Sequence, residues 1–290
     1  MRGAGDSFGI VTRFYLKSQP IPTLVRRFLY NLDKLYGDAD RMAITFSNAQ
    51  SCVRDPKVSH ASFGLTIRIS TNMYQVAGYH YGSNEEYDRL DACLKRHLGI
   101  KSDNIRPMTF LGALSMIAGA TPLEQPLDAN NVKANFYAKS TLVPENNQLN
   151  GKSMKPYFGY IFREGRRVKN QFTITFRLMG GPGSQVAKRG DAFSAVSNRN
   201  ALWIVQHDGN TARNPSLVKN MIKGAHEELI KAGNGGNWGS FAPFVDSILG
   251  TREAHKAYFS AATHRKLEKI KYKWDKGDVF QNPHAVLPMK

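Results

Sequence analysis

The sequence predicts an α+β domain, in which a mainly antiparallel β-sheet is covered by helices. Segments with period-two hydrophobicity and segments with helical periodicity are intermixed along the chain, without the regular strand–helix alternation of a parallel sheet. At 290 residues, with 41% hydrophobic and 22% charged residues, the chain has an ordinary globular composition and can bury a sizeable core. No window approaches ~18 uninterrupted apolar residues, so no membrane-spanning helix is expected.

Strands are expected where apolar residues alternate or form short runs between turn signals. In chain order these segments are residues 7–16, 42–46, 63–70, 75–81, 135–142, 172–179 and 202–207. The proline-containing stretch 18–22 ends the first strand, and the glycine-rich turn 180–183 ends the sixth.

Helices are expected where apolar residues recur at helical spacing. In chain order these segments are residues 24–36, 84–98, 110–118, 153–167, 216–231 and 253–274. Ser83 ahead of Glu85 and Glu86 is a typical helix start, and Gly99 is expected to end that helix. The last helix is amphipathic and follows the glycine-rich loop 233–239.

Neither the cysteines nor the pair His255 and His264 indicates a metal site. Cys52 and Cys93 lack CxxC spacing and are expected to be free, buried thiols rather than a disulfide or zinc ligands. His255 and His264 lie nine residues apart on one predicted helix, too far for a paired metal site, and are expected to be exposed. No apolar segment follows the N-terminal residues, so no signal peptide is expected in this chain, and the compartment stays open.

The net charge of +17, from 40 basic and 23 acidic residues, favours polyanions as partners. The basic residues are nevertheless spread along the chain. The densest runs, 163–169 and 265–273, alternate with apolar and acidic residues as on a solvated helix face. No RNA-binding or zinc-finger signature accompanies them, so the charge alone does not indicate a nucleic-acid-binding protein.

Two short motifs suggest chemistry that their surroundings do not support. Residues 3–9 resemble a dinucleotide fingerprint, but the third glycine comes one residue late and a strand is expected to follow instead of a helix. His207-Asp208 lies near a strand end, but no Gly-x-Ser-x-Gly nucleophile elbow accompanies it. The aromatic segment 238–244 suits either an apolar pocket wall or ordinary core packing.

Both ends of the chain resemble one enzyme family. Residues 2–14, with Gly-Ala-Gly followed by Phe-Gly-Ile-Val-Thr, are similar to a stretch late in the flavin-binding domain of berberine-bridge-enzyme-like, FAD-linked oxidases. Residues 271–286, with a lysine, Asp275, a phenylalanine and Asn-Pro-His-x-Val, resemble the C-terminal signature of that family. Between them, segments 136–140, 180–184 and 238–239 follow the order seen in fungal oligosaccharide oxidases.

This resemblance implies that the chain is the C-terminal half of an FAD-linked oxidase. Residues 1–20 would be the end of the FAD-binding domain, 21–250 the substrate-binding α+β domain, and 251–290 a segment that returns to the flavin. The sequence that would hold the pyrophosphate, and the His and Cys that often bond the flavin covalently, has no counterpart here. A missing N-terminal FAD-binding half is therefore an expected partner, besides a small-molecule substrate. Relatives are often secreted.

The resemblance also implies site residues. Residues expected to face FAD are Gly5, Ser7, Phe8, Gly9, Ile10, Val11, Asn282 and His284. Packing of Phe8 and Ile10 in a strand core is the alternative. Residues expected to face the substrate are His207, Asp208, Phe241 and Phe244.

Relatives transfer a hydride from a substrate C–H bond to flavin N5 while a tyrosine takes the hydroxyl proton, and O2 then reoxidises the flavin. Phe241 and Phe244 occupy the positions of the two tyrosines in the family's Tyr-x-Asn-Tyr segment. A phenyl ring cannot accept a proton, so no catalytic residue is assigned. A flavin-free binding, isomerase or cyclase module derived from this domain is the alternative function. Without the rest of the flavin domain, residues 7–16 are expected to leave a strand edge and apolar surface uncovered.

Overall fold

A computed structural model of the protein describes residues 2–101, 105–119, 135–147, 149–190, 193–236 and 238–289. Its centre is a seven-stranded sheet with the order β4-β1-β3-β2-β6-β7-β5, in which every neighbouring pair is antiparallel. The strands are β1 (Val25–Asn31), β2 (Phe63–Ser70), β3 (Met73–His80), β4 (Ile105–Met108), β5 (Phe136–Pro144), β6 (Phe172–Leu178) and β7 (Ala201–Asn210). The predicted α+β class is confirmed.

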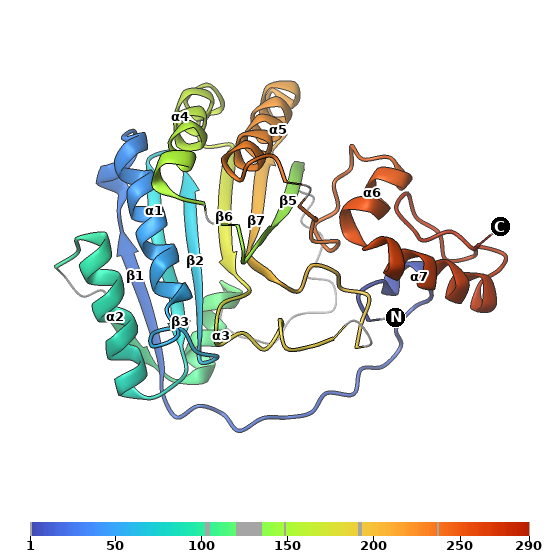
Figure 1. Ribbon diagram of the computed structural model, residues 1–290, viewed down its shortest axis with the longest axis horizontal. Helices are drawn as coiled ribbons and strands as arrows, with labels where there is room; N and C mark the ends of the chain where they lie inside the picture. The colour runs from blue at the N-terminus through green and yellow to red at the C-terminus, as the bar shows by residue number, and fades with distance from the viewer. Residues whose placement is uncertain are drawn as a thin grey trace.

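A row of four helices covers one face of this sheet (Figure 1). They are α2 (Asn84–Leu98), α1 (Ala39–Arg54), α4 (Gly151–Val168) and α5 (Pro215–Ala232). The main core lies between the two layers, where the rings of Phe46, Phe176 and Trp203 pack against one another. The opposite side, which we call the open face, carries the alternate residues of each strand, such as Thr66 and Arg68 of β2. The short helix α3 (Phe110–Ala118) lies on that side, contacting β1.

The two ends of the chain form a smaller cluster beside the sheet (Figure 1). It contains η1 (Gly5–Ser7), α6 (Thr251–Tyr258) and α7 (Ala261–Trp274). Its buried members are Ala4, Ala254, Tyr258, Phe259, Leu267 and Val286. Residues 8–24 then run without secondary structure from this cluster to β1.

Several predicted elements are wrong. Residues 7–16 form no strand, because they pair with none of the described strands. Residues 24–36 form β1 and the short 3-10 helix η2 (Asp33–Leu35), since long-range pairing with β3 and β4 overrides the local helical spacing. Residues 42–46 lie inside α1, where Met42 and Phe46, one helical turn apart, are both buried. The predicted helix 253–274 is two helices: the first ends at Tyr258, and Ser260 caps the second by accepting a hydrogen bond from the Thr263 N–H at 3.1 Å.

The remaining predicted elements are confirmed within a few residues, and α2 shows the capping box of Ser83 and Glu86. The cysteine prediction is wrong: Cys52 of α1 and Cys93 of α2 form a disulfide. Sequence spacing alone could not reveal that these two helices pack side by side. In the part of the chain that the structure describes, no helix has both the length and the apolar character needed to cross a membrane.

Candidate functional site

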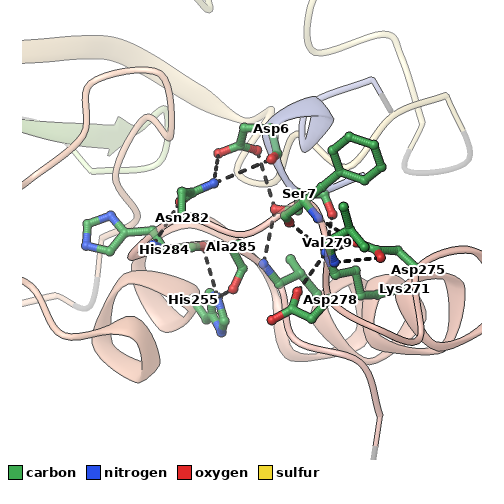
Figure 2. Close-up of polar contacts among 12 residues, drawn as sticks. Asp6, Ser7, His255, Lys271, Asp275, Asp278, Val279, Asn282, His284 and Ala285 are labelled. Atoms are coloured by element: carbon green, nitrogen blue, oxygen red, sulfur yellow. Dashed lines mark hydrogen bonds and ion pairs between the residues drawn. The ribbon is translucent and has the colours of Figure 1, made fainter. Parts of the chain in front are cut away.

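The N-terminal and C-terminal segments, which the sequence predicts to face the same cofactor, are bonded to each other (Figure 2). The buried Ser7 hydroxyl accepts a hydrogen bond from the backbone N–H of Val286 at 3.0 Å, and the Ser7 carbonyl accepts one from Lys271 Nζ at 2.7 Å. Lys271 is completely buried and also contacts Asp275 at 2.6 Å and Asp278 at 2.9 Å. A buried cation with two carboxylate partners thus fixes the N-terminal segment to α7.

The protonation states at this junction support the ion pair. The hydrogen bond from Lys271 lowers the pKa of Asp275 to about 2, and backbone N–H groups of Val279 and Phe280 contribute in the same direction. Burial acts to lower the pKa of Lys271, but the two carboxylates outweigh it and raise that pKa above its ordinary value. Both partners are therefore charged near neutral pH.

Asn282 and His284 lie at the same junction but face different surroundings. The exposed Asn282 side chain donates from Nδ2 to the carbonyl and carboxylate oxygens of Asp6, both at 3.4 Å. His284 is buried, with its Nε2 2.9 Å from the carbonyl oxygen of Leu249 and its ring against Tyr258. Asn282 can therefore meet a ligand at the surface, whereas the His284 ring holds the C-terminal segment in place.

The N-terminal residues around this junction differ in exposure. Phe8 is half-buried and packs against the terminal cluster, which supports the packing alternative for this residue. Ile10 and Val11 are 81% and 44% exposed, so they belong to no core. A side chain at Gly5 would meet nothing within 4 Å, which leaves its backbone accessible. These residues offer open backbone and apolar surface to a ligand.

A cavity of about 390 Å³ opens beside the junction. Its lining includes residues 3–6 of the N-terminal segment, residues 240–243 of the loop before α6, and Tyr258. The loop is fixed to β5, because the N–H of Phe241 donates to Ser140 Oγ and Ser240 Oγ donates to the Ser140 carbonyl, both at 2.9 Å. The aromatic segment after Trp238 is thus a pocket wall.

A chain of contacts links the two phenylalanines to the open face of the sheet. The rings of Phe241 and Phe244 lie 5.2 Å apart, edge to face, and the guanidinium of Arg177 lies 5.7 Å from the centre of the Phe244 ring. Arg177 donates to Gln206 at 2.7 Å, and Gln206 donates to Asp208 at 2.8 Å. Burial raises the pKa of Asp208, while the bond from Gln206 and the charge of Arg177 oppose that rise.

His207 does not share this surface, so its prediction as a substrate contact needs correction. Successive strand residues point to opposite faces of a sheet, and His207 therefore points into the helix-covered core. It has no exposed surface, and its Nε2 lies 3.1 Å from the hydroxyl of Tyr157. Burial holds the pKa of His207 well below its ordinary value, so it remains neutral.

Two polar groups near the site were missed or misjudged from the sequence. Asp246 is 3% exposed, forms an ion pair with Lys139 and accepts from the hydroxyl of Tyr137 at 3.1 Å. The sequence did contain a signal for Asp246, because it is the only acidic residue in the aromatic loop before α6.

His255 and His264 were expected to be exposed and apart, but the break at Ser260 turns α7 back so that His264 Nε2 lies 2.9 Å from His255 Nδ1.

Comparisons with known proteins agree with this architecture. No family model matches the chain. The chain is 25% identical to a chitooligosaccharide oxidase from Gibberella zeae, covering 99% of this chain and 57% of that protein. It is 26% identical to a carbohydrate oxidase from Microdochium nivale, covering 100% of this chain and 58% of that protein.

Solved structures of the same group share the fold. A xylooligosaccharide oxidase from Myceliophthora thermophila superposes with a TM-score of 0.85 at 18% identity, over 99% of this chain and 60% of that chain. The berberine-bridge-enzyme-like protein 1 of Physcomitrella patens gives a TM-score of 0.72 at 14% identity, over 94% of this chain and 56% of that chain. The chain spans a little less than 60% of the length of the curated relatives it matches. It is a homologue of fungal carbohydrate oxidases and FAD-linked oxidoreductases, shares the fold of a berberine-bridge-enzyme-like protein, and covers only part of these relatives, as a C-terminal portion would.

Proposed function

We propose that this protein is the C-terminal portion of an FAD-dependent oxidase that acts on an alcohol carbon of a carbohydrate or a secondary metabolite. The observation that carries the proposal is the bonded junction of Ser7 with Lys271 and Val286. It joins the two segments that the family resemblance implies would face the flavin, at the rim of a cavity of about 390 Å³. In this proposal residues 1–20 complete the FAD-binding domain, 21–250 bind substrate, and 251–290 return to the flavin.

FAD would supply the hydride acceptor and the reactivity with O2. Toward that cofactor, the exposed residues Ile10, Val11 and Asn282 offer contacts, and the backbone around Gly5 permits close approach. Gly9 follows in the same segment and is assigned to the cofactor side with it. The remaining residues proposed for the cofactor side, Ser7, Phe8 and His284, hold these segments in position through the junction. An N-terminal FAD-binding half, encoded upstream or separately, would cover the exposed stretch 8–24.

On the substrate side, we assign Asp208, Phe241 and Phe244. The two rings and the cavity wall suit the apolar faces of a sugar ring or a metabolite. Asp208 is the acid in the contact chain that runs from Phe244 through Arg177 and Gln206, and its carboxylate can accept a hydrogen bond from a substrate hydroxyl.

A flavin-free binding module is the second candidate. The replacement of both tyrosines by Phe241 and Phe244 favours it, since neither ring can take a proton. An isomerase or cyclase that needs no hydride acceptor would belong to the same class.

An absorbance spectrum of the purified chain, recorded before and after incubation with FAD and gel filtration, tests the proposal. Flavin that is retained by the chain, or by the chain mixed with an upstream FAD-binding half, supports the oxidase, and a screen of alcohols for peroxide formation follows. A protein that stays colourless in both cases favours the flavin-free module. Asn282→Ala is the matched variant, because it removes a surface contact without removing the buried Lys271 anchor.

A further inference from the structure

A cluster of two histidines and a glutamate lies outside this site. His60 lies in the connection between α1 and β2, His80 is the last residue of β3, and Glu86 belongs to the first turn of α2. Their possible ligand atoms all lie within 4.8 Å of one another. From this geometry we infer that His60, His80 and Glu86 form a site for a divalent transition-metal ion of the zinc type.

The imidazole nitrogens of this cluster lack the partners that buried polar atoms normally have. His80 has no exposed surface, and neither of its ring nitrogens has a hydrogen-bond partner among the described residues. His60 Nε2 is buried and equally unpartnered within that part of the chain. His60 Nδ1 receives only a long hydrogen bond, 3.3 Å, from the N–H of Ser62. Because unsatisfied buried nitrogens are costly, an ion that takes the lone pair of one nitrogen in each ring would stabilise this corner of the fold.

The distances between these side chains, and the partial exposure of His60 and Glu86, allow all three to bind one ion. His60 Nδ1 lies 3.9 Å from Glu86 Oε2, too far for a hydrogen bond but a separation that two ligands of one ion can span with small movements. Gly82 makes the close approach possible, because a side-chain carbon there would lie 2.0 Å from Glu86 Oε2 and 3.1 Å from His80 Cε1. The side chains of His60 and Glu86 are 18% and 31% exposed, so an ion and a water ligand can enter from solvent.

The charges around the cluster are compatible with a cation. Either tautomer of the neutral, buried His80 ring leaves one nitrogen lone pair without a partner among the described residues, so that lone pair is available to a metal ion. Glu86 contributes a negative charge, while its Oε2 also accepts the capping hydrogen bond from Ser83 at 3.0 Å. Arg26 lies opposite His80 in the sheet, with its guanidinium over the ring of Tyr87, 5.5 Å from the ring centre. Its positive charge reaches His80 and opposes the cation, whereas the carboxylate of Glu86 favours it.

The ligand types decide the class of ion. Two imidazoles and one carboxylate, with a further position left for water, match Zn²⁺ and its neighbours in the transition series better than Ca²⁺ or Mg²⁺, which prefer oxygen ligands. The three ligands come from three separate segments, so a bound ion would tie the start of α2 and the connection after α1 to the end of β3.

Calorimetric titration of the chelator-treated 290-residue chain with Zn²⁺ tests the site, with Co²⁺ absorbance as a second probe. We expect one equivalent of Zn²⁺ to bind and to raise the Tm. His60→Ala and Glu86→Gln should each weaken binding by about tenfold or more and abolish the rise in Tm. The glutamine oxygen can still accept the bond from Ser83, so the cap of α2 is kept.

His264→Ala is the control, because it removes a partly exposed histidine from the separate His255–His264 pair. Binding and the rise in Tm should survive this change. Circular dichroism of the metal-free protein verifies that each variant is folded. If Glu86→Gln unfolds, His60→Ala decides the result, because His60 lies outside every helix and strand that the structure describes. No stoichiometric binding to the native chain, or binding that both ligand substitutions leave unchanged, would overturn the site and leave bound water as the partner of these nitrogens.

Discussion

The ammonium group of Lys271 donates a hydrogen bond of 2.7 Å to the backbone carbonyl oxygen of Ser7, across 264 residues of sequence. This bond closes the chain on itself at the proposed cofactor side. Because Lys271 also holds Asp275 and Asp278, one buried cation organises both terminal segments. The geometry of the proposed flavin surface therefore depends on a residue that would not touch the flavin.

Lys271→Met should release the N-terminal segment from α7. The change leaves two carboxylates without their buried partner, and we expect a loss of about 3 kcal/mol or more in the stability of the terminal cluster. Hydrogen exchange of residues 4–8 should accelerate, while the sheet remains protected. Lys269→Met, an exposed lysine of the same helix, is the control and should leave exchange unchanged. Equal exchange in both variants would contradict the role of Lys271.

The same ion pair predicts an acid-sensitive terminal cluster. The folded-state pKa of Asp275 is lowered from 3.8 to about 2, so its stabilising contribution is fully present above the ordinary value and is lost as the pH falls through the lowered one. Hydrogen exchange of the terminal cluster, followed from pH 5 down to about 2, should therefore accelerate in the native chain. In Asp275→Asn, which is already destabilised at neutral pH, the dependence should be weaker. If hydrogen exchange in Asp275→Asn depends on pH as steeply as in the native chain, the acid sensitivity comes from other carboxylates.

Removal of the disulfide should destabilise the helix layer. Cys52 and Cys93 close a loop of 41 residues, for which the loss of chain entropy in the unfolded state gives about 4 kcal/mol. Cys52→Ser/Cys93→Ser should lower the free energy of unfolding by up to that amount. A reducing agent should lower the Tm of the native chain and not that of the double variant. If reduction has no effect on the native chain, the disulfide does not form.

The elements that the sequence predicts correctly are those with local signals. Helix α2 has a capping serine before its first turn and a glycine at its end, and strand β2 alternates between buried and more exposed residues. Residues 24–36 and 42–46 carry apolar spacing that suits either a helix or a strand, and only pairing with distant strands or packing on the sheet decides between them. Adjacency in sequence also suggested one site for His207 and Asp208, although strand geometry sends them to opposite faces. The Lys271 anchor and the His255–His264 contact depend on how the chain ends fold together, which no local pattern contains.

Asp208→Asn should reduce catalysis in the flavin-loaded assembly if the open face binds substrate. The amide keeps the shape but removes the charge that strengthens a hydrogen bond from a substrate hydroxyl, so kcat/KM should fall about tenfold or more. Thr173→Ser is the matched control, because Thr173 lies directly opposite Asp208 on the neighbouring strand β6. Unchanged kinetics in Asp208→Asn would remove this residue from the substrate side.

The exposed N-terminal stretch should make the isolated chain self-associate. Ile10, Phe14 and Leu16 are 81%, 75% and 88% exposed, and no acidic residue lies between them in the sequence. Clustered apolar surface of this kind favours association with another surface, either a flavin-binding half or a second copy of the chain. Light scattering should therefore show concentration-dependent oligomers for the native chain and fewer for Ile10→Ser/Phe14→Ser/Leu16→Ser.

Addition of an upstream FAD-binding half should suppress the same oligomers, because it would cover the same stretch. The control is Ile44→Ser, which removes an apolar side chain that is 53% exposed on α1, far along the chain from this stretch. If self-association persists in the triple variant but disappears in Ile44→Ser, the copies associate through the helix layer. A native chain that stays monomeric at high concentration would show that the stretch needs no cover, and the case for a missing half would then depend on the flavin titration alone.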